Sequence, residues 1–319
     1  MRYNGRTMKK TVLIADTELD LEMQVDHLPK GNEDMPAIQS SSTRISGAGW
    51  WIANVFHVMD FPVEWLSCVG SGEYGDVVYN ALKAAKTALP SRSRDTAGCT
   101  WTFIDDKGSV SGMSAAGAEY EIPLARLKNL KADDVRCSIL AGTMLDGSTR
   151  DDLLSRLSNL RNLIFIPLGR GSVQEKGTLG LIFDVRPITV LREEELSLMT
   201  GEEEDLKAGA QKLSGRTKNA VLVAMNSGEV YLFDGTEGSI IPIDINPADD
   251  GSGAFETFCG AFAAGRAAGL SIPGSVYFGR DFLAHAFHGA FTKADQKAVK
   301  DALVERIMSD HKKPKANLS

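Results

Sequence analysis

The chain has 319 residues, of which 43% are hydrophobic and 24% are charged, and its formal net charge is −7. This length allows one large or two smaller domains with a sizeable buried core. The negative charge excludes a global electrostatic attraction to nucleic acid or anionic membrane, and we expect neither as a partner. No apolar run approaches the ~18 residues of a membrane-spanning helix.

The cysteines lie in or beside apolar runs: Cys68, Cys99, Cys137 and Cys259. None forms a C-x-x-C pair, so we expect buried, reduced thiols, which are typical of a reducing cytosol. Residues 1–10 are polar and lack the apolar stretch of a signal peptide. We therefore predict a cytoplasmic protein whose residues 1–10 form a flexible extension.

The first third of the chain predicts an opening strand and a small β appendage. Residues 11–15 (TVLIA) are a short apolar run, typical of the first strand of an α/β sheet. Residues 21–46 mix polar and apolar residues around the turn signal 29–32, which predicts short strands rather than a helix. Residues 98–113 predict a hairpin whose turn is 105–108. Because these segments do not fit a parallel layer, we expect them to form a lid.

The rest of the chain alternates predicted strands with predicted helices. The strands are 63–69, 138–141, 163–166, 181–183, 220–224 and 229–233. The helices are 50–60, 76–86, 150–160, 193–199, 255–268, 279–291 and 299–308. Such alternation is typical of a mostly parallel sheet with helices on both faces, so we predict a three-layer α/β domain over 11–308 and a polar tail at 309–319.

The strongest local signal for chemistry is Asp250–Phe262 (DGSGAFETFCGAF), which enters a helix rich in Ala and Gly. Small residues at a helix start let an anion approach the backbone N–H groups, where the helix dipole favours negative charge. Glu256 in the first turn can act as a base on a hydroxyl group. Local chemistry leaves an alternative open, in which Glu256 only complements the helix dipole beside a flexible turn.

This segment resembles the pattern D-T-x-G-A-G-D-T-F-x-G-A-F of the ribokinase-like (PfkB) carbohydrate kinases. The resemblance implies a ribokinase-like fold with a β lid and phosphoryl transfer from ATP, with Mg²⁺, to a hydroxyl group of a sugar or nucleoside-like molecule. It places the anion hole at Gly253, Ala254 and Phe255, and the general base at Glu256. It also implies a homodimer formed through the lid.

Other segments match the family in the same chain order. The substrate carboxylate falls on Asp20, and the sugar-binding Gly-Gly-x-x-x-Asn segment falls on residues 46–51 (SGAGWW). The substrate-binding positions implied are Asp20, Gly47, Gly49 and Trp51. The nucleotide-binding positions implied are Asn226, Gly228, Gly253 and Arg280. The cation positions implied are Glu195, acting indirectly on Mg²⁺, and Asp250 and Ser252 for a monovalent ion such as K⁺.

Four positions differ from the family pattern: Trp51, Arg192, Phe255 and Glu256 stand where the family has Asn, Asn, Gly and Asp. Two functions therefore stay open, an active kinase of a small hydroxylated molecule and a catalytically impaired relative that binds one. An indole at position 51 removes hydrogen bonding and adds a stacking face, so we expect a substrate other than ribose.

Two weaker motifs predict other functions. Residues 70–75 (GSGEYG) match the dinucleotide fingerprint, but they follow the second strand and no acidic residue ends a strand ~20 residues later. His285 and His288 share a predicted helix face without further ligands in sequence, which favours packed or surface side chains over a metal site. The sequence therefore disfavours a dehydrogenase and a histidine metal centre.

Overall fold

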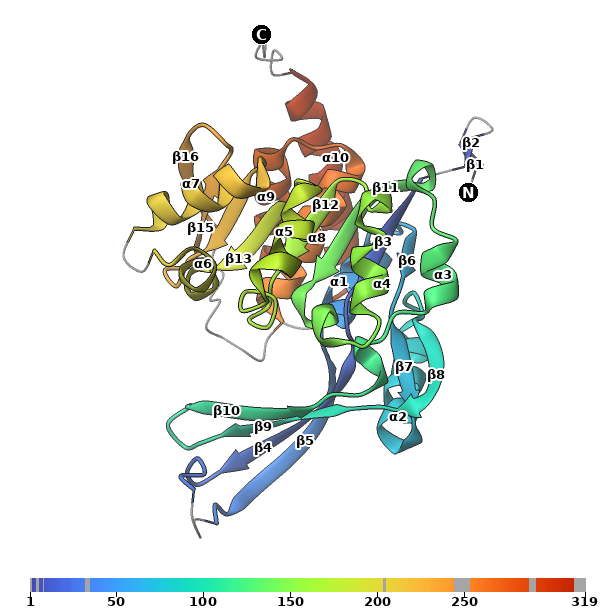
Figure 1. Cartoon of the computed structure of the whole chain (residues 1–319), viewed down its shortest axis with the longest axis vertical. Helices are drawn as coiled ribbons and strands as arrows, with labels where there is room; N and C mark the ends of the chain where they lie inside the picture. The colour runs from blue at the N-terminus through green and yellow to red at the C-terminus, as the bar shows by residue number, and fades with distance from the viewer. Residues whose placement is uncertain are drawn as a thin grey trace.

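The computed structural model describes residues 2–3, 6–7, 9–31, 35–202, 205–243, 253–286 and 291–312. Its centre is a sheet in the order β16-β15-β14-β13-β12-β11-β3-β6 (Figure 1). The strands are β3 (Lys10–Ile14), β6 (Val63–Trp65), β11 (Val135–Ala141), β12 (Leu163–Ile166), β13 (Ile188–Arg192), β14 (Val221–Ala224), β15 (Glu229–Phe233) and β16 (Gly238–Pro242). From β14 to β6 all pairings are parallel, and β15 and β16 join antiparallel.

The inner strands are continuous apolar runs. Every residue of β12 (LIFI) and β14 (VLVA) is buried. This pattern is typical of parallel strands that are covered on both faces. The predicted three-layer α/β arrangement is confirmed.

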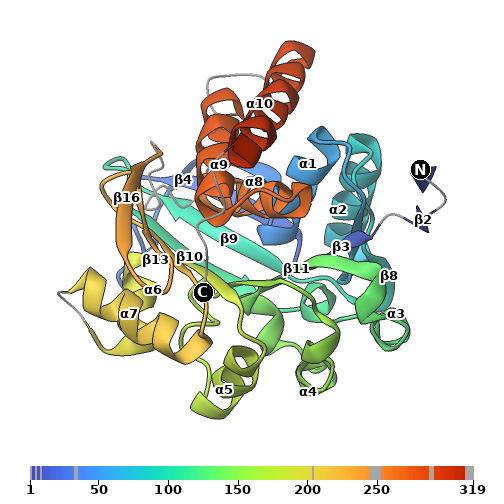
Figure 2. The same cartoon turned by 90° about the horizontal axis from the view of Figure 1, so that it is seen from above.

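Helices cover both faces of the central sheet (Figure 2). One face carries α1 (Ala48–Val58), α8 (Ala254–Ala268), α9 (Ile272–Ala286) and α10 (Lys293–Lys312). The other carries α3 (Leu124–Lys128), α4 (Arg150–Leu154), α5 (Lys176–Asp184), α6 (Glu193–Thr200) and α7 (Leu206–Thr217). Phe56, Phe255, Phe258 and Phe262 are among the largest fully buried side chains, so the α1–α8 side of the core is rich in aromatic rings.

A second sheet, in the order β10-β9-β4-β5, forms the lid and extends away from the main body (Figure 1). Its strands are β4 (Glu18–Val25), β5 (Ile38–Ser46), β9 (Cys99–Ile104) and β10 (Val110–Ala115). Because β4 follows β3 after residues 15–17, the lid begins at the carboxyl edge of the central sheet. The segments at 21–46 and 98–113 meet in this sheet, where β4 pairs with β9 in parallel.

The remaining elements are smaller. Two short sheets pair β1 (Arg2–Tyr3) with β2 (Arg6–Thr7), and β7 (Cys68–Ser71) with β8 (Ser91–Thr96). Helix α2 (Gly72–Ala85) follows β7, and the short helical turns are η1 (Ala118–Tyr120), η2 (Ala132–Asp134), η3 (Gly142–Asp146) and η4 (Leu157–Asn159).

Several predicted elements differ from the structure. Residues 181–183 belong to helix α5 and not to a strand, because a short apolar run alone does not distinguish a buried strand from a buried helix turn. The predicted strand 63–69 is divided between β6 and β7, which lie in different sheets. Helix α9 begins at Ile272, and α10 continues to Lys312, beyond the predicted end at Met308.

All four cysteines are buried and unpaired, which confirms that prediction. Within the described ranges, no helix is both long enough and apolar enough to cross a membrane.

Candidate functional site

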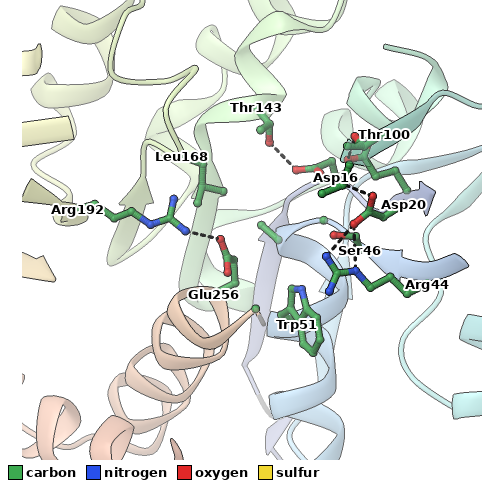
Figure 3. A pocket seen from close by; sticks show the side chains of 15 residues that line it. Asp16, Asp20, Arg44, Ser46, Trp51, Thr100, Thr143, Leu168, Arg192 and Glu256 are labelled. Atoms are coloured by element: carbon green, nitrogen blue, oxygen red, sulfur yellow. Dashed lines mark hydrogen bonds and ion pairs between the residues drawn. The ribbon is translucent and has the colours of Figure 1, made fainter. Parts of the chain in front are cut away.

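A cavity of about 290 Å³ lies at the carboxyl edge of the central sheet, between the sheet, the lid and the first turn of α8 (Figure 3). Ligands of open α/β sheets bind at this edge. Asp16 follows β3, Thr143 follows β11, Leu168 follows β12, and Arg192 ends β13. The residues contributed by the lid are Glu18, Asp20, Arg44, Ser46, Thr100 and Thr102.

Three carboxylates face this cavity from alternate positions of one extended segment. Asp16, Glu18 and Asp20 all line the cavity. The intervening Leu19 is buried in the core, with 3% of its surface exposed. Successive side chains of extended backbone point to opposite faces, so the spacing of two residues brings the three carboxylates to one side. The family motif predicts a substrate-binding role for Asp20 only, although the two-residue spacing of Asp16, Glu18 and Asp20 is visible in the sequence.

Asp20 is held inside the lid by both of its oxygens. Arg44 donates to Oδ2 through Nε at 3.0 Å and Nη2 at 2.8 Å, and Thr102 donates to Oδ1 at 2.8 Å. The register explains the ion pair, since Asp20 on β4 lies directly opposite Arg44 on β5. Asp20 therefore joins β5 to β9 across β4, at the wall of the cavity.

Asp16 and Glu18 receive hydrogen bonds from hydroxyl groups. Thr143 donates to Asp16 Oδ1 at 2.5 Å, and Thr100 donates to Glu18 Oε1 at 2.7 Å. Burial raises the pKa of Asp16, while the Thr143 hydrogen bond opposes this shift. Burial, followed by repulsion from Asp16, raises the pKa of Glu18 to about 8. At neutral pH this pKa favours a protonated Glu18.

Two predicted substrate glycines shape the loop that carries Asp16. Gly47 precedes α1 with φ +88°, and a Cβ there would lie 2.7 Å from Asp16 Oδ2. Gly49 donates its N–H to the Asp16 carbonyl at 2.8 Å. A Cβ at Gly49 would lie 2.3 Å from the Trp65 ring. Gly47 lines the cavity, whereas Gly49 packs beneath the loop without lining it.

Glu256 and Arg192 meet at the opposite wall (Figure 3). Arg192 Nη2 donates to Glu256 Oε1 at 3.3 Å, and both side chains are 16% exposed. The Arg192 guanidinium also lies over the Phe255 ring, 4.5 Å from its centroid, which is a cation–π contact. Phe255 is 2% exposed, so its side chain packs in the core and does not occupy the cavity.

Trp51 packs directly against the start of α8. Gly253 is the N-cap of α8, with φ +70°, and a Cβ there would lie 2.1 Å from Trp51 Cε2. Only glycine fits at position 253, because of this approach and the left-handed backbone. On its other side Trp51 lines an apolar groove with Val58 and Phe282 among others. The indole therefore separates the polar cavity from an apolar groove.

Glu195 lies behind the cavity wall. Its Oε2 accepts the Arg192 N–H at 2.8 Å, which completes a capping box at the start of α6, and its Oε1 accepts the Gly169 N–H. Burial raises the pKa of Glu195. Because both oxygens are engaged by backbone, Glu195 positions Arg192 and the loop at Leu168, and it does not line the cavity.

Three of the four predicted nucleotide positions lie away from this cavity, and the fourth, Gly253, lines it. Asn226 and Gly228 occupy the turn between β14 and β15, at the same sheet edge as Arg192, and the Asn226 N–H donates to Glu193 at 2.8 Å. Arg280 on α9 pairs with Asp281 at 2.9 Å. None of the three predicted residues lines the cavity.

Some predicted positions lie outside the described residues, namely Asp250, Ser252 and His288. His285 Nδ1 lies 3.6 Å from a carboxylate oxygen of Asp295. Within the part of the chain that the structure describes, no group of three or more His, Cys, Asp or Glu side chains could hold a metal ion.

The sheet, the lid and the cavity between them define a ribokinase-like α/β protein. The chain belongs to the pfkB family of carbohydrate kinases, whose family model matches residues 8–282. No curated protein matches the chain.

Solved structures of similar fold share little sequence with this chain. The ribokinase of Thermotoga maritima is 18% identical, with a TM-score of 0.73 over 94% of this chain and 100% of its own. The ribokinase of Arabidopsis thaliana, solved with ribose and ATP, is 20% identical, with a TM-score of 0.72 over 93% and 99%. The nucleoside kinase of Methanocaldococcus jannaschii is 17% identical, with a TM-score of 0.68 over 95% and 99%.

Proposed function

We propose that the protein transfers the γ-phosphoryl group of ATP to a hydroxyl group of a sugar or sugar-like molecule bound beneath the lid. The observation that carries this proposal is that Glu256, in the first turn of α8, lines the same cavity as the lid carboxylates. The N-terminus of a helix favours a phosphate group. Membership of the family and the ATP bound by the similar Arabidopsis ribokinase support the nucleotide.

The chemistry follows from these positions. Glu256 accepts the proton of the substrate hydroxyl, and the hydroxyl oxygen forms a bond to the γ-phosphorus as the bond from phosphorus to the ADP oxygen breaks. The proton on Glu256 then passes to solvent. The backbone at 253–255 forms the anion hole, and Arg192 adds positive charge beside Glu256. Positioning and electrostatics supply most of the acceleration in such a transfer.

Mg²⁺ is proposed to enter with the nucleotide. Mg²⁺ keeps several waters and is usually bound by substrate phosphates with one or two carboxylates, so it needs no protein cage. This fits the absence of a metal-binding group of three side chains among the described residues. Glu195 acts indirectly by holding Arg192 and the loop at Leu168. We also propose a K⁺ ion near Asp250 and Ser252 and a cytoplasmic location. We further propose a homodimer formed through the lid, which light scattering tests.

The second candidate is a relative that binds a small molecule and transfers no phosphate. Two observations favour it. First, Arg192 forms an ion pair with Glu256, so the carboxylate proposed as the base is already engaged. The Trp51 indole lies against Gly253, where a phosphoryl group would approach the helix start.

An ADP-release assay with Mg-ATP over a panel of sugars, amino sugars and nucleosides separates these functions. In the kinase, Glu256→Gln lowers kcat by about 100-fold or more, because a general base contributes that much, while substrate binding measured by calorimetry is retained. Glu194→Gln, at an exposed position of α6, is the control and keeps full activity. Ligand binding without ADP release in the natural chain supports the impaired relative.

A further inference from the structure

The charges in the cavity are unevenly paired. Arg44 pairs with Asp20 and Glu22, and Arg192 pairs with Glu256. The remaining carboxyl groups that line the cavity, Asp16 and Glu18, have hydroxyl donors but no cationic partner among the described residues. The cavity therefore holds two adjacent acidic groups that have no cationic partner in the described part of the chain.

Each of these two groups also has an oxygen without a donor. Glu18 Oε2 is buried and has no hydrogen-bond partner in the described part of the chain. Asp16 is 4% exposed, and no other described residue donates to its Oδ2, which faces the space left by the missing side chain of Gly47. A buried acceptor without a hydrogen-bond partner is unfavourable, and more so when the group is charged. A ligand that brings donors to these oxygens would remove that cost.

A third carboxylate strengthens the negative potential from behind. Glu119 on η1 is 1% exposed, and its oxygens accept the N–H groups of Gly98 at 2.9 Å and Gly117 at 2.6 Å. Glu119 repels the charged forms of both Asp16 and Glu18. A positively charged group in the cavity would therefore interact favourably with three carboxylates at once.

We infer that the substrate carries a protonated amine beside its hydroxyl groups, as in an amino sugar or an amino polyol, and that its ammonium group binds between Asp16 and Glu18. This inference rests on the proposed function for the phosphorylated hydroxyl. An ammonium group has three donors and no acceptor, which suits two carboxyl groups with unfilled acceptor positions. A metal ion suits the site less well, because the described residues form no group of three ligands.

Proton release follows from the same arrangement. The titratable and charged groups around this pair are Asp20, Arg44, Cys99, Glu119 and Tyr120. Because burial raises the pKa of Glu18 to about 8, this carboxyl group retains its proton at neutral pH when no cation lies beside it. An ammonium group stabilises the charged carboxylate and displaces that proton, whereas a neutral sugar does not.

Calorimetry with matched ligand pairs tests the inference. Each pair consists of an amine and its neutral counterpart: D-glucosamine and D-glucose, galactosamine and galactose, and 1-amino-1-deoxyribitol and ribitol. Binding is measured at pH 7 in two buffers of different ionisation enthalpy, so that proton release can be detected. We expect at least one amine to bind about 10-fold or more tightly than its neutral partner, with proton release. Equal or tighter binding of the neutral members, or no binding by any amine, overturns the inference.

Matched variants locate the amine. Glu18→Gln and Asp16→Asn each should remove the preference for the amine, while Glu22→Gln on the same strand should leave it unchanged. Melting temperatures show whether each variant is folded. If Asp16→Asn does not fold, Glu18→Gln still tests the site, because glutamine has nearly the same shape as glutamate. An amine preference that survives in folded Glu18→Gln contradicts the assignment.

The inference and the proposed function fail in different ways. Glu256→Gln should bind the amine with the same preference even when phosphoryl transfer is lost. An amine that binds without ever being phosphorylated supports the inference and contradicts the kinase. Phosphorylation of neutral sugars alone supports the kinase and contradicts the inference.

Discussion

Gly47 is a position where the backbone and its surroundings both demand glycine. Its φ is +88°, and a Cβ would lie 2.7 Å from Asp16 Oδ2 and 2.8 Å from the Asp16 carbonyl oxygen. Gly72 has the same φ of +88°, but a Cβ there meets nothing within 4 Å. Substitution at Gly72 therefore measures the cost of backbone strain alone, whereas substitution at Gly47 measures strain together with steric overlap.

We predict that Gly47→Ala destabilises the protein more than Gly72→Ala does. Both substitutions introduce strain of about 1–3 kcal/mol, because a side chain rarely adopts positive φ. Gly47→Ala adds overlap with Asp16, which costs about 1–3 kcal/mol more when the structure cannot relax. Urea denaturation measures both free energies of unfolding. Equal losses in the two variants would show that the Asp16 loop moves freely.

The Trp51 side chain packs against the start of α8. The indole lies against Gly253 and lines the apolar groove on its far side. Trp51→Ala should therefore open the polar cavity toward that groove and expose the helix start. Calorimetry should show weaker binding of any ligand that stacks on the indole, by about 10-fold, since aromatic contacts contribute about 0.5–1.5 kcal/mol beyond their buried area. Unchanged affinity would exclude a stacking role.

At the scale of elements, the lid is organised by strand register. Asp20 on β4 lies opposite Arg44 on β5 and Thr100 on β9, and the side chains of these strands alternate between the cavity and the other face. The polar wall of the cavity is therefore a property of three strands paired in one register. A slip of one residue would reverse every side chain and remove the carboxylates from the cavity.

Helix α6 begins with a cap that also supports the cavity wall. Glu195 accepts N–H groups from Arg192 and Gly169, so Glu195→Ala would remove the acceptor of both hydrogen bonds. We expect a loss of about 1–3 kcal/mol in the free energy of unfolding, measured in urea, because a hydrogen bond to a charged group contributes about 1.5–3 kcal/mol and water can replace part of it at the exposed Gly169. Glu194→Ala on the exposed side of the same turn should cost less than about 0.5 kcal/mol. Similar losses in both variants would contradict the capping role.

At the scale of the whole molecule, buried acids should make stability depend on pH. Burial raises the pKa of Glu18 from 4.5 to about 8 and also raises the pKa values of Asp16 and Glu195. Between pH 4.5 and about pH 8, Glu18 is protonated in the folded chain and ionised in the unfolded chain. The stability that this proton brings is complete below pH 4.5 and is lost as the pH rises through about 8.

The melting temperature of the natural chain should therefore fall between pH 5 and pH 9. A tenfold change in an acid dissociation constant between the folded and unfolded chain corresponds to about 1.4 kcal/mol of stability. Glu18→Gln should reduce this slope and melt at a higher temperature than the natural chain at pH 9, because glutamine cannot ionise. Glu22→Gln is the control on the same strand and should keep the slope of the natural chain. Parallel curves for Glu18→Gln and the natural chain would contradict the burial of Glu18.

The sequence by itself determined the layers and the lid. Apolar runs that alternate with helices predict a covered parallel sheet, and the hairpin at 98–113 carries its own turn signal, so both could be predicted from local patterns. The motif at 250–262 identified Glu256 and Gly253 in the same way, and both line the cavity. The strand predicted at 181–183 was wrong because three apolar residues fit either a strand or a helix turn.

Only the tertiary structure decided how the charged groups of the site are paired. Glu256 meets Arg192 across 64 positions of sequence, and Thr143 reaches Asp16 across 127, separations that no local pattern encodes. The direction of Phe255 into the core likewise depends on the packing of α8 against the sheet, which the motif does not contain. Charge pairing and burial arise from contacts between distant segments. They leave Asp16 and Glu18 with hydroxyl donors and without a cationic partner among the described residues.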